Sequence, residues 1–258
     1  MARRLVRDGA AAIVTAGGDG TINTVVNALA GIDVPLGILP LGTANDLARE
    51  LGIPLDMERA LRRMTIGTER RIDLVEVNGR AFCTVGGLGL PAACALAVDD
   101  LRARGGMRAV VGRFGTSIYS AVAAATILRA RHAPQRLRIT VRTPTGAEER
   151  IDVMAHGLFI ANQAALAAGL VLPTGSSNVD GIFELCIVGA VARTRLLAAL
   201  ACLKCGRPIP AGVFMVRAAT SAHIESSADT TFFGDGDFIG AGRRFVVRMR
   251  PRALRVLH

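Results

Sequence analysis

The chain has 258 residues, of which 51% are hydrophobic, so it can bury the core of one large domain or of two modest ones. Its formal net charge of +10 favours an anionic partner, but the absence of Trp and the single Tyr leave few platforms for base stacking, so we expect no nucleic-acid partner. The five cysteines lack the spacing of a disulfide scaffold and are typical of thiols in a reducing cytosol.

The first elements in chain order predict a parallel α/β unit. The apolar runs Ala10–Thr15 and Pro35–Leu39 have the length of buried strands. Each is followed by a glycine turn and then by a helical pattern, which is the order expected of a parallel sheet. The predicted helices lie at Ala2–Arg7, at Thr21–Ala30, between Asn45 and Gly52, and at Met57–Met64.

The pattern changes near Arg71, where short strand signals replace the alternation of strand and helix. Ile72–Val77 and Ala81–Val85 flank "NGR", a hairpin signal, and a helix is predicted at Ser117–Arg131. Further strands are predicted at Leu137–Arg142, Ile151–Met154, Leu158–Ala161, Gly181–Val188, Val213–Ala218, His223–Glu225 and Arg244–Met249. We therefore expect an α/β domain over residues 1–70 and a mostly β domain over 71–258, whose last strand could return to the first domain.

The stretch "AGGDGT" follows the first predicted strand and opens the helix after it. Glycines allow a backbone to approach a ligand, and the N-terminus of a helix attracts phosphate. Asp19 nevertheless places a carboxylate in the middle of this turn. A glycine turn alone is also an ordinary connection between a strand and a helix.

The stretch "PLGTAND", Pro40–Asp46, repeats this arrangement at the end of the second strand. Taken alone, Thr43, Asn45 and Asp46 are ordinary helix-capping residues. Two such turns at the ends of adjacent parallel strands would instead lie side by side at the carboxyl edge of the sheet, where α/β proteins bind ligands.

A third polar turn, "GDGD" at Gly234–Asp237, lies between Phe233 and Phe238. It is either a polar hairpin turn or a functional pair of carboxylates. In the second case, Asp235 and Asp237 are candidates for a general base or for Mg²⁺ ligands.

Together, "GGDGT", "PLGTANDLA", "GDGD" and the closing "RPRALRVL" resemble the diacylglycerol kinase catalytic-domain superfamily, in its bacterial lipid kinase branch. The resemblance covers nearly the whole chain. It implies an α/β nucleotide domain, a β-sandwich domain and an active site between them. It also implies transfer of the γ-phosphoryl group of ATP, with Mg²⁺, to a lipid hydroxyl, most simply that of diacylglycerol or a related lipid alcohol.

The resemblance assigns a role to each motif. Asp237 would be the base, at a position where the family usually has Glu, and Asp235 would support it. Asp19 would reach the nucleotide through Mg²⁺, water or a nucleotide hydroxyl. A structural Mg²⁺ would bind Asp180 and the backbone carbonyls of Ser177 and Ile182. The nucleotide would be bound by Gly17, Gly18, Asp19, Gly20, Thr21, Asn23, Gly42, Thr43, Asn45 and Asp46.

The arginines suggest a second partner. From Leu101 to Ala147 there are nine arginines and no Asp or Glu, so this segment would rest on an anionic membrane surface or form a solvated face. We expect a cytoplasmic protein bound peripherally to membranes. Val153–Val179 is long and uncharged but contains Asn, Gln, Pro and Gly, which favours a strand and loop over a membrane span.

Two alternatives to an active lipid kinase remain open. One is a metabolite kinase of the NAD kinase type, which shares "GGDGT" but should carry a "GINxGxLGF" loop where this chain has "GILPLGTAND". The other is an inactive membrane-associated remnant, because family members normally open with an "NPxSG"-like strand and Met1 falls in a later helix. A sheet without that strand would expose an edge, so we also expect self-association, such as a homodimer.

Overall fold

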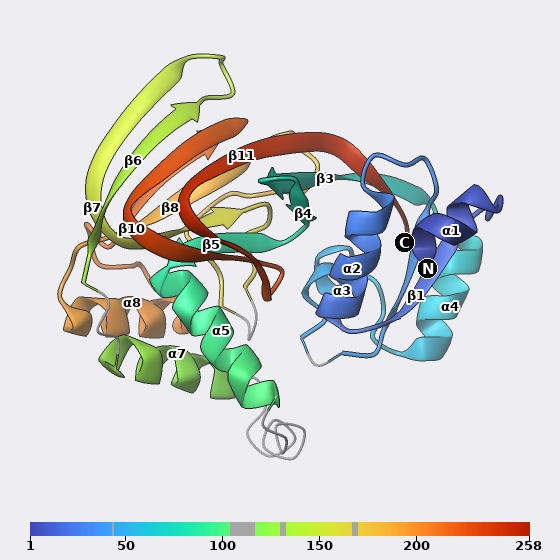
Figure 1. The fold of residues 1–258 in the computed structure, drawn as a ribbon. Coiled ribbons are helices and arrows are strands. Elements are labelled where there is room, and N and C mark those ends of the chain that lie inside the picture. Colours follow the sequence, from blue (N-terminus) through green and yellow to red (C-terminus); the bar gives the residue numbers. More distant parts are fainter. Residues whose placement is uncertain (43, 104–116, 130–132, 167–169) are drawn as a thin grey trace.

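The computed structural model describes residues 1–42, 44–103, 117–129, 133–166 and 170–258. The chain forms two lobes joined by strands that run through both (Figure 1). The described strands form one sheet in the order β1-β2-β11-β10-β5-β7-β8-β9, with β3, β4 and β6 paired at its sides. The expected fold class, an α/β unit followed by a β-rich unit, is confirmed.

The N-terminal lobe is a small α/β unit. Its strands β1 (Ile13–Gly17) and β2 (Leu36–Pro40) pair in parallel, so both end at the same edge of the sheet. Helix α2 (Asp19–Leu29) buries Ile22, Val26 and Leu29 at helical spacing against these strands. The remaining helices are α1 (Ala2–Arg7), α3 (Asp46–Glu50) and α4 (Met57–Ile66).

The C-terminal lobe is built on two long strands that each change partner along their length. Strand β10 (Ser221–Gly234) pairs first with β6 (Gln135–Arg142) and then with β5 (Val85–Gly89). Strand β7 (Glu148–Ala161) also pairs with both of these, so the four strands fold round a common core that includes Phe232. Strands β8 (Phe183–Gly189) and β9 (Phe214–Ala219) extend the sheet beyond β7. β7 joins two segments that the sequence suggested as separate strands.

Two strands connect the lobes. β11 (Asp237–Leu257) pairs with β10, then with β3 (Glu69–Val77), and reaches β2 through Val256 and Leu36. A bulge between Arg250 and Leu254 bends it on the way. β3 continues into β4 (Arg80–Phe82) through a tight turn in which Asn78 and Gly79 have positive φ, as the "NGR" signal predicts.

Three helices cover one face of the C-terminal lobe: α5 (Leu90–Ala103), α7 (Ser117–Arg129) and α8 (Arg193–Cys205) (Figure 1). The sequence indicated only α7, and residues 130–131 of that predicted helix lie outside the described residues. Cys202 and Cys205 are in the last turn of α8, and all five cysteines are free. Within the described residues, no helix has both the length and the apolar character needed to cross a membrane.

Candidate active site

The two glycine turns touch each other at the carboxyl edge of β1 and β2. The N–H of Leu41 donates to the carbonyl of Gly17 at 3.0 Å. A Cβ on Gly18 would lie 3.1 Å from the Cα of Gly42, closer than side chains normally approach a backbone. Glycine at both positions lets the turns approach this closely, and a Cβ on Gly42 would overlap the Cα of Gly18. Gly18 is also the N-cap of α2 and provides no side-chain cap, so the first turn of this helix is open to an anion.

Asp19 joins the two turns. One oxygen of its carboxylate accepts the N–H of Asp46 at 2.8 Å, and the other accepts the N–H of Asn45 at 3.0 Å. These N–H groups begin α3, so the carboxylate satisfies donors that a helix start leaves open. The carboxylate of Asp19, which lies in a turn of the kind that binds phosphate, therefore has structural partners within the chain. Whether it also reaches a nucleotide stays a prediction.

Asn45 shapes the second turn from within. It has a left-handed backbone with φ of 51°. Its side chain accepts the N–H of Gly42 at 2.9 Å and donates to the carbonyl of Gly42 at 2.8 Å. Thr43, which lies between them, is outside the described residues. In the first turn, the side chain of Thr21 packs over Gly17, where a Cβ would collide with it.

Asparagines on α2 connect the glycine turns to the C-terminal lobe. Asn23 is buried, and its amide donates to the carbonyl of Gly234 at 3.4 Å. Asn27 donates to the carbonyl of Ala81 and accepts the N–H of Ala81, both at 2.8 Å. The acidic turn from Gly234 to Asp237 is thus held against α2, which brings together motifs that are more than two hundred residues apart in the sequence.

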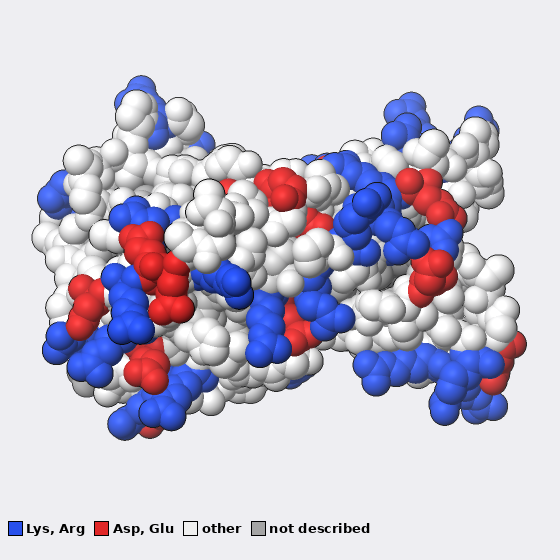
Figure 2. All heavy atoms as spheres, turned by 90° about the horizontal axis from the view of Figure 1, so that it is seen from above, with Lys and Arg blue, Asp and Glu red and all other residues white. Residues whose placement is uncertain are grey.

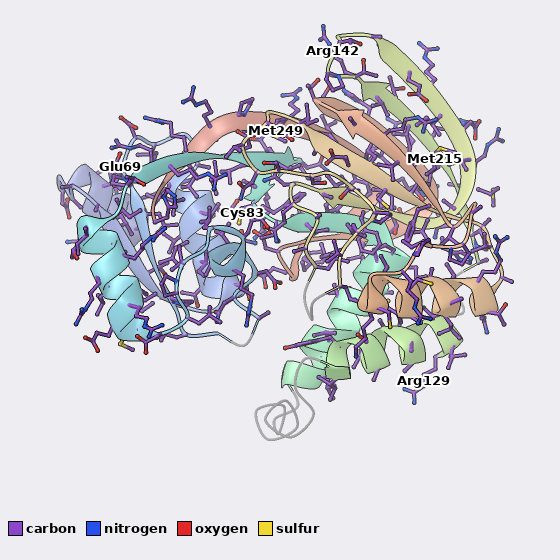
Figure 3. The ribbon with its side chains drawn as sticks, turned by 180° about the vertical axis from the view of Figure 1, so that it is seen from behind. Glu69, Cys83, Arg129, Arg142, Met215 and Met249 are labelled. Carbon is purple, nitrogen blue, oxygen red and sulfur yellow. The ribbon has the colours of Figure 1, made fainter. Side chains whose placement is uncertain are left out.

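Within the acidic turn, Asp235 has its carboxylate enclosed by the bend between β4 and β5. It accepts hydrogen bonds from the N–H, hydroxyl and thiol groups of Cys83 and Thr84. Figure 3 shows Cys83 between the two lobes. Burial raises the pKa of Asp235, and the hydrogen bonds from Thr84 and Cys83 oppose this effect. Burial, followed by the charge of Asp235, also raises the pKa of Cys83, so this thiol stays protonated.

Asp237 is placed differently from Asp235. Its side chain is exposed. Its carboxylate oxygens lie 3.4 and 3.5 Å from where a Cβ of Gly20 would be, over the first turn of α2. The residue between the two acids, Gly236, has a φ of +86° and lines the large pocket described next. The backbone therefore directs one carboxylate into the protein and the other toward the glycine turns.

A large pocket opens between the acidic turn and the three helices. At one end it is lined by Asp19, Asp46, Thr84 and Asp235. Elsewhere it is lined by apolar side chains of α5, α7, α8 and the adjacent sheet, such as Leu90, Tyr119, Ile127, Phe159, Leu196, Leu203 and Phe214. A small polar end joined to a long apolar cavity suits an amphipathic ligand.

The loop expected to bind a structural Mg²⁺ lies beside β3. The carboxylate of Asp180 is exposed and accepts the N–H of Ile182 at 3.1 Å. The fully buried Asp73 supports this loop, because its carboxylate accepts the N–H groups of Gly181 and Arg252, each at 2.7 Å. The sequence analysis missed Asp73. Its position between Ile72 and Leu74, within the buried apolar stretch of β3, is the signal that could have drawn attention to it.

The arginine-rich segment does not form a single face in its described part. Arg136 makes a bidentate pair with Asp152, and Arg138 lies 3.8 Å from the same carboxylate. Arg129 and Arg142 lie at opposite ends of the C-terminal lobe (Figure 3). On the sheet side, acidic side chains lie among the basic ones (Figure 2). Arg104, Arg108, Arg113 and Arg131 are outside the described residues.

Comparison with known proteins identifies the family. Residues 1–77 match the family model described as the diacylglycerol kinase catalytic domain, and residues 91–258 match the YegS C-terminal NAD kinase beta sandwich-like domain. The chain belongs to the family of diacylglycerol kinases and YegS-like lipid kinases. Membership in this lipid kinase family favours the lipid kinase interpretation over the NAD kinase alternative.

Individual relatives agree with this assignment. A diacylglycerol kinase of Mycobacterium tuberculosis (strain ATCC 25618 / H37Rv) is 30% identical over 239 residues, which cover 90% of this chain and 72% of the relative. A diacylglycerol kinase of Bacillus subtilis (strain 168) is 50% identical over 80 residues, 30% of this chain and 26% of the relative. The crystal structure of a diacylglycerol kinase from Bacillus anthracis str. Sterne shares the fold, with a TM-score of 0.74 at 19% identity, covering all of this chain and 82% of that one.

The residues of this lipid kinase family member fit the nucleotide that the family uses. The close approach of Gly18 and Gly42 and the uncapped start of α2 form a backbone cradle suited to phosphate. For Mg²⁺, kinases usually provide one or two carboxylates and leave the remaining positions to phosphates and water. Asp46 and Asp237, beside this cradle, have the right oxygen donors. Within the described residues, no group of three or more His, Cys, Asp or Glu side chains forms a metal cluster.

Proposed function

We propose that this protein transfers the γ-phosphoryl group of ATP to the hydroxyl group of a lipid alcohol, such as diacylglycerol. One observation carries the proposal: a single pocket joins the carboxylates of Asp19, Asp46 and Asp235 to a cavity lined by apolar side chains. The triphosphate would lie along Gly17–Thr21 and Gly42, with Asn23 and Asn45 holding the turns in place. The acyl chains would lie between the sheet and helices α5, α7 and α8.

In this proposal Asp237 is the general base. It follows Gly236, which lines the pocket, and its carboxylate lies over Gly20 at the start of α2. A lipid hydroxyl at the polar end of the pocket would give its proton to Asp237 as the oxygen attacks phosphorus in line. Asp46 would bind Mg²⁺, which neutralises phosphate charge when bound. The protein thus contributes mainly position and electrostatics.

The charge of the pocket supports an uncharged acceptor. The charged side chains among its described lining residues are Asp19, Asp46 and Asp235, with no Lys, Arg or His among them. An anionic phospholipid would bring its phosphate toward these carboxylates and be repelled. A neutral lipid alcohol has no such penalty, which favours diacylglycerol or a related compound as the substrate.

Three further parts of the proposal concern the surroundings of the site. The pocket-lining helices, with Arg129 at the end of α7, would face an anionic membrane and admit the lipid. A structural Mg²⁺ would bind Asp180 and the carbonyls of Ser177 and Ile182. Strand β1 lies at the edge of the sheet and exposes Val14, so two copies could pair there as a homodimer.

The test is phosphoryl transfer from labelled ATP with Mg²⁺ to diacylglycerol and phosphatidylglycerol in mixed micelles. We expect an organic-extractable product from diacylglycerol, reduced at least about hundredfold in Asp237→Asn. Asp229→Asn removes an exposed carboxylate that pairs with Arg243, and serves as the matched control with unchanged activity.

Other outcomes would decide between the alternatives. Label that appears only in the aqueous phase would favour a metabolite kinase. A folded protein that neither transfers phosphate nor releases heat when titrated with MgATP would contradict the kinase proposal and support the inactive remnant.

A further inference from the structure

The closing motif "RPRALRVL" takes no part in the candidate active site, yet its first residues line another cavity of the molecule. Residues 250–253, in the bulge of β11, form one side of this cavity. Residues 31–33, in the loop after α2, form the other side, and Arg71 of β3 lies between them in the lining. The N–H of Gly31 donates to the carbonyl of Ala253 at 2.9 Å, so the loop is fixed against the bulge. The cavity therefore lies where the N-terminal lobe meets the strands that connect the lobes.

Arg252 gives this cavity a positive charge that has no counter-ion in the chain. Its backbone N–H donates to the buried carboxylate of Asp73 at 2.7 Å, which holds the residue in the bulge. Its side chain is exposed and makes no hydrogen bond or ion pair with any residue that the structure describes. A surface arginine in water needs no partner, but this one lines a cavity that two other arginines also line.

The other two arginines of the cavity keep hydrogen-bond donors to spare. Nη1 of Arg250 donates to Glu76 at 2.6 Å, while its Nη2 lies 3.5 Å from where a Cβ of Gly31 would be. Arg71 donates through Nη2 to Asp33 at 2.5 Å. A guanidinium group has five N–H donors in a planar fork, so both side chains can also bind a ligand.

The charge of the cavity favours an anion. Its described lining residues include three arginines and one acid, Asp33. That acid is already matched by Arg71 and by Arg255, whose Nη1 lies 3.0 Å from it. The excess positive charge is therefore that of Arg252, and basic side chains gather where the two lobes meet (Figure 2). Guanidinium groups round one cavity repel each other unless an anion lies between them.

Phosphate fits this cavity better than a carboxylate does. A phosphate monoester carries about 1.5 to 2 negative charges at pH 7 and has three acceptor oxygens, whereas a carboxylate carries one charge on two oxygens. Guanidinium groups bind phosphate through pairs of N–H donors. Three of them round one cavity can satisfy all three oxygens of a phosphate, which a carboxylate would leave in excess.

The position of the cavity favours a soluble ligand over a lipid headgroup. Glu69 and Met249, which lie close to the cavity along β3 and β11, are on the opposite side of the molecule from Arg129 of α7 (Figure 3). A membrane that contacts the helices round the lipid pocket would therefore not reach the cavity.

We propose that this cavity is a second anion site, which binds the phosphate group of a soluble molecule through Arg71, Arg250 and Arg252. The bound phosphate links the loop after α2 to the bulge of β11 and so stabilises the junction of the lobes. The site is separate from the glycine turns at the other end of α2, and it does not depend on the proposed function.

The test is a titration with inorganic phosphate at constant ionic strength, followed by the NMR signals of the backbone amides of Gly31 and Ala253. We expect both signals to shift and to saturate. Arg252→Gln should weaken phosphate binding at least about tenfold, because it removes charged donors without breaking a contact within the chain. Arg252→Lys keeps the charge but not the fork, and should bind with intermediate affinity.

The matched control is Arg248→Gln. Arg248 is also an exposed arginine of β11, but it does not line the cavity. The same loss of charge there should change the affinity less than about twofold. An equal loss of affinity in Arg248→Gln and Arg252→Gln would show that phosphate is attracted only by the general positive charge, and would overturn the proposal.

The same spectra separate this site from the nucleotide site. Phosphate that shifts only the amides of Gly18 and Gly42 binds at the glycine turns alone, which would overturn the proposal. If Gly31 shifts and responds to Arg252→Gln in a protein that phosphorylates no lipid, the proposed function fails and this site stands.

Vesicles of phosphatidylcholine with phosphatidic acid distinguish the source of the phosphate. We expect Arg252→Gln to bind these vesicles as well as the wild-type protein does. Vesicle binding that is lost in Arg252→Gln, with no shift of Gly31 by inorganic phosphate, would assign the arginine to a lipid surface and overturn the proposal of a soluble ligand.

Discussion

Gly42 lies against Gly18 so closely that a Cβ on Gly42 would overlap the Cα of Gly18. Gly42→Ala must therefore push the two turns apart, and we expect it to weaken MgATP binding at least about tenfold and to destabilise the fold by about 1–3 kcal/mol. Isothermal calorimetry and thermal unfolding measure the two effects. Gly175→Ala is the control, because no atom lies within 4 Å of the position of its Cβ.

Gly18→Ala should behave like a milder version of the same change. Its Cβ would lie 3.1 Å from the Cα of Gly42, a contact that a shift of a few tenths of an ångström relieves. We expect weaker MgATP binding than in the wild-type protein but stronger binding than in Gly42→Ala. The reverse order in calorimetry would mean that the two turns do not meet as described.

Asp19 should contribute to stability as well as to nucleotide binding. Asp19→Asn keeps one oxygen for the N–H of Asn45 or Asp46 but points an NH₂ group at the other donor. The expected loss is about 1–3 kcal/mol in the free energy of unfolding, measured with urea in the absence of nucleotide. Asp8→Asn, at an exposed carboxylate in a weak pair with Arg4, should change stability by less than about 0.5 kcal/mol. Equal effects of the two variants would contradict the role given to Asp19.

Asn27 should be a main connection between α2 and the C-terminal lobe. Asn27→Asp keeps the acceptor for the N–H of Ala81 but turns a donor into an acceptor that faces the carbonyl of Ala81. We expect a loss of about 1–3 kcal/mol in the free energy of unfolding, larger than for Asn27→Ser. Circular dichroism during urea unfolding checks this, and a wild-type midpoint in Asn27→Asp would argue against the connection.

Glu184 should make stability depend on pH. Burial raises its pKa above the ordinary 4.5, while a hydrogen bond from Ser176 opposes this and the charge of Asp180 adds to it. The pKa of Glu184 is higher in the folded state than in the unfolded state. Its contribution to the free energy of unfolding is therefore fully present below the unfolded-state pKa and is lost as the pH rises through the folded-state pKa.

Glu184→Gln removes this loss of stability at higher pH, and its side-chain oxygen still accepts the hydroxyl of Ser176. The variant should therefore be more stable than the wild-type protein at about pH 7, and this advantage should disappear at about pH 4. Thermal unfolding at both pH values measures the difference. An advantage of the same size at both would show that the titration of Glu184 is not its cause.

The elements with strong local patterns were predictable from the sequence. α2 shows its buried face in the spacing of Ile22, Val26 and Leu29. α5 was missed because it begins directly after a glycine-rich strand and carries Pro91 in its first turn, where proline is tolerated. In β7, a register shift between Ala155 and Gly157 interrupts the alternation, so one strand gives the pattern of two.

The three motifs of the candidate site were predictable, but the contacts within it were not. Thr84 and Asp235 are separated by 151 residues, and they meet only because of the register between β5 and β10. Similarly, Asp73 receives donors from Gly181, in a distant loop, and from Arg252, in the bulge of β11. Local patterns indicate which residues carry chemistry, whereas the pairing of strands decides which of them meet.

The path of β11 has a consequence for folding during synthesis. Residues 254–257 of this strand pair with β3 at residues 69–72, and Val256 lies beside Leu36 of β2. The N-terminal lobe is translated first, yet its sheet lacks a central strand until residues 254–257 have been synthesised as well. Such distant pairing slows folding and leaves apolar strand edges unpaired in the meantime. The nascent lobe should therefore depend on chaperones more than its small size suggests.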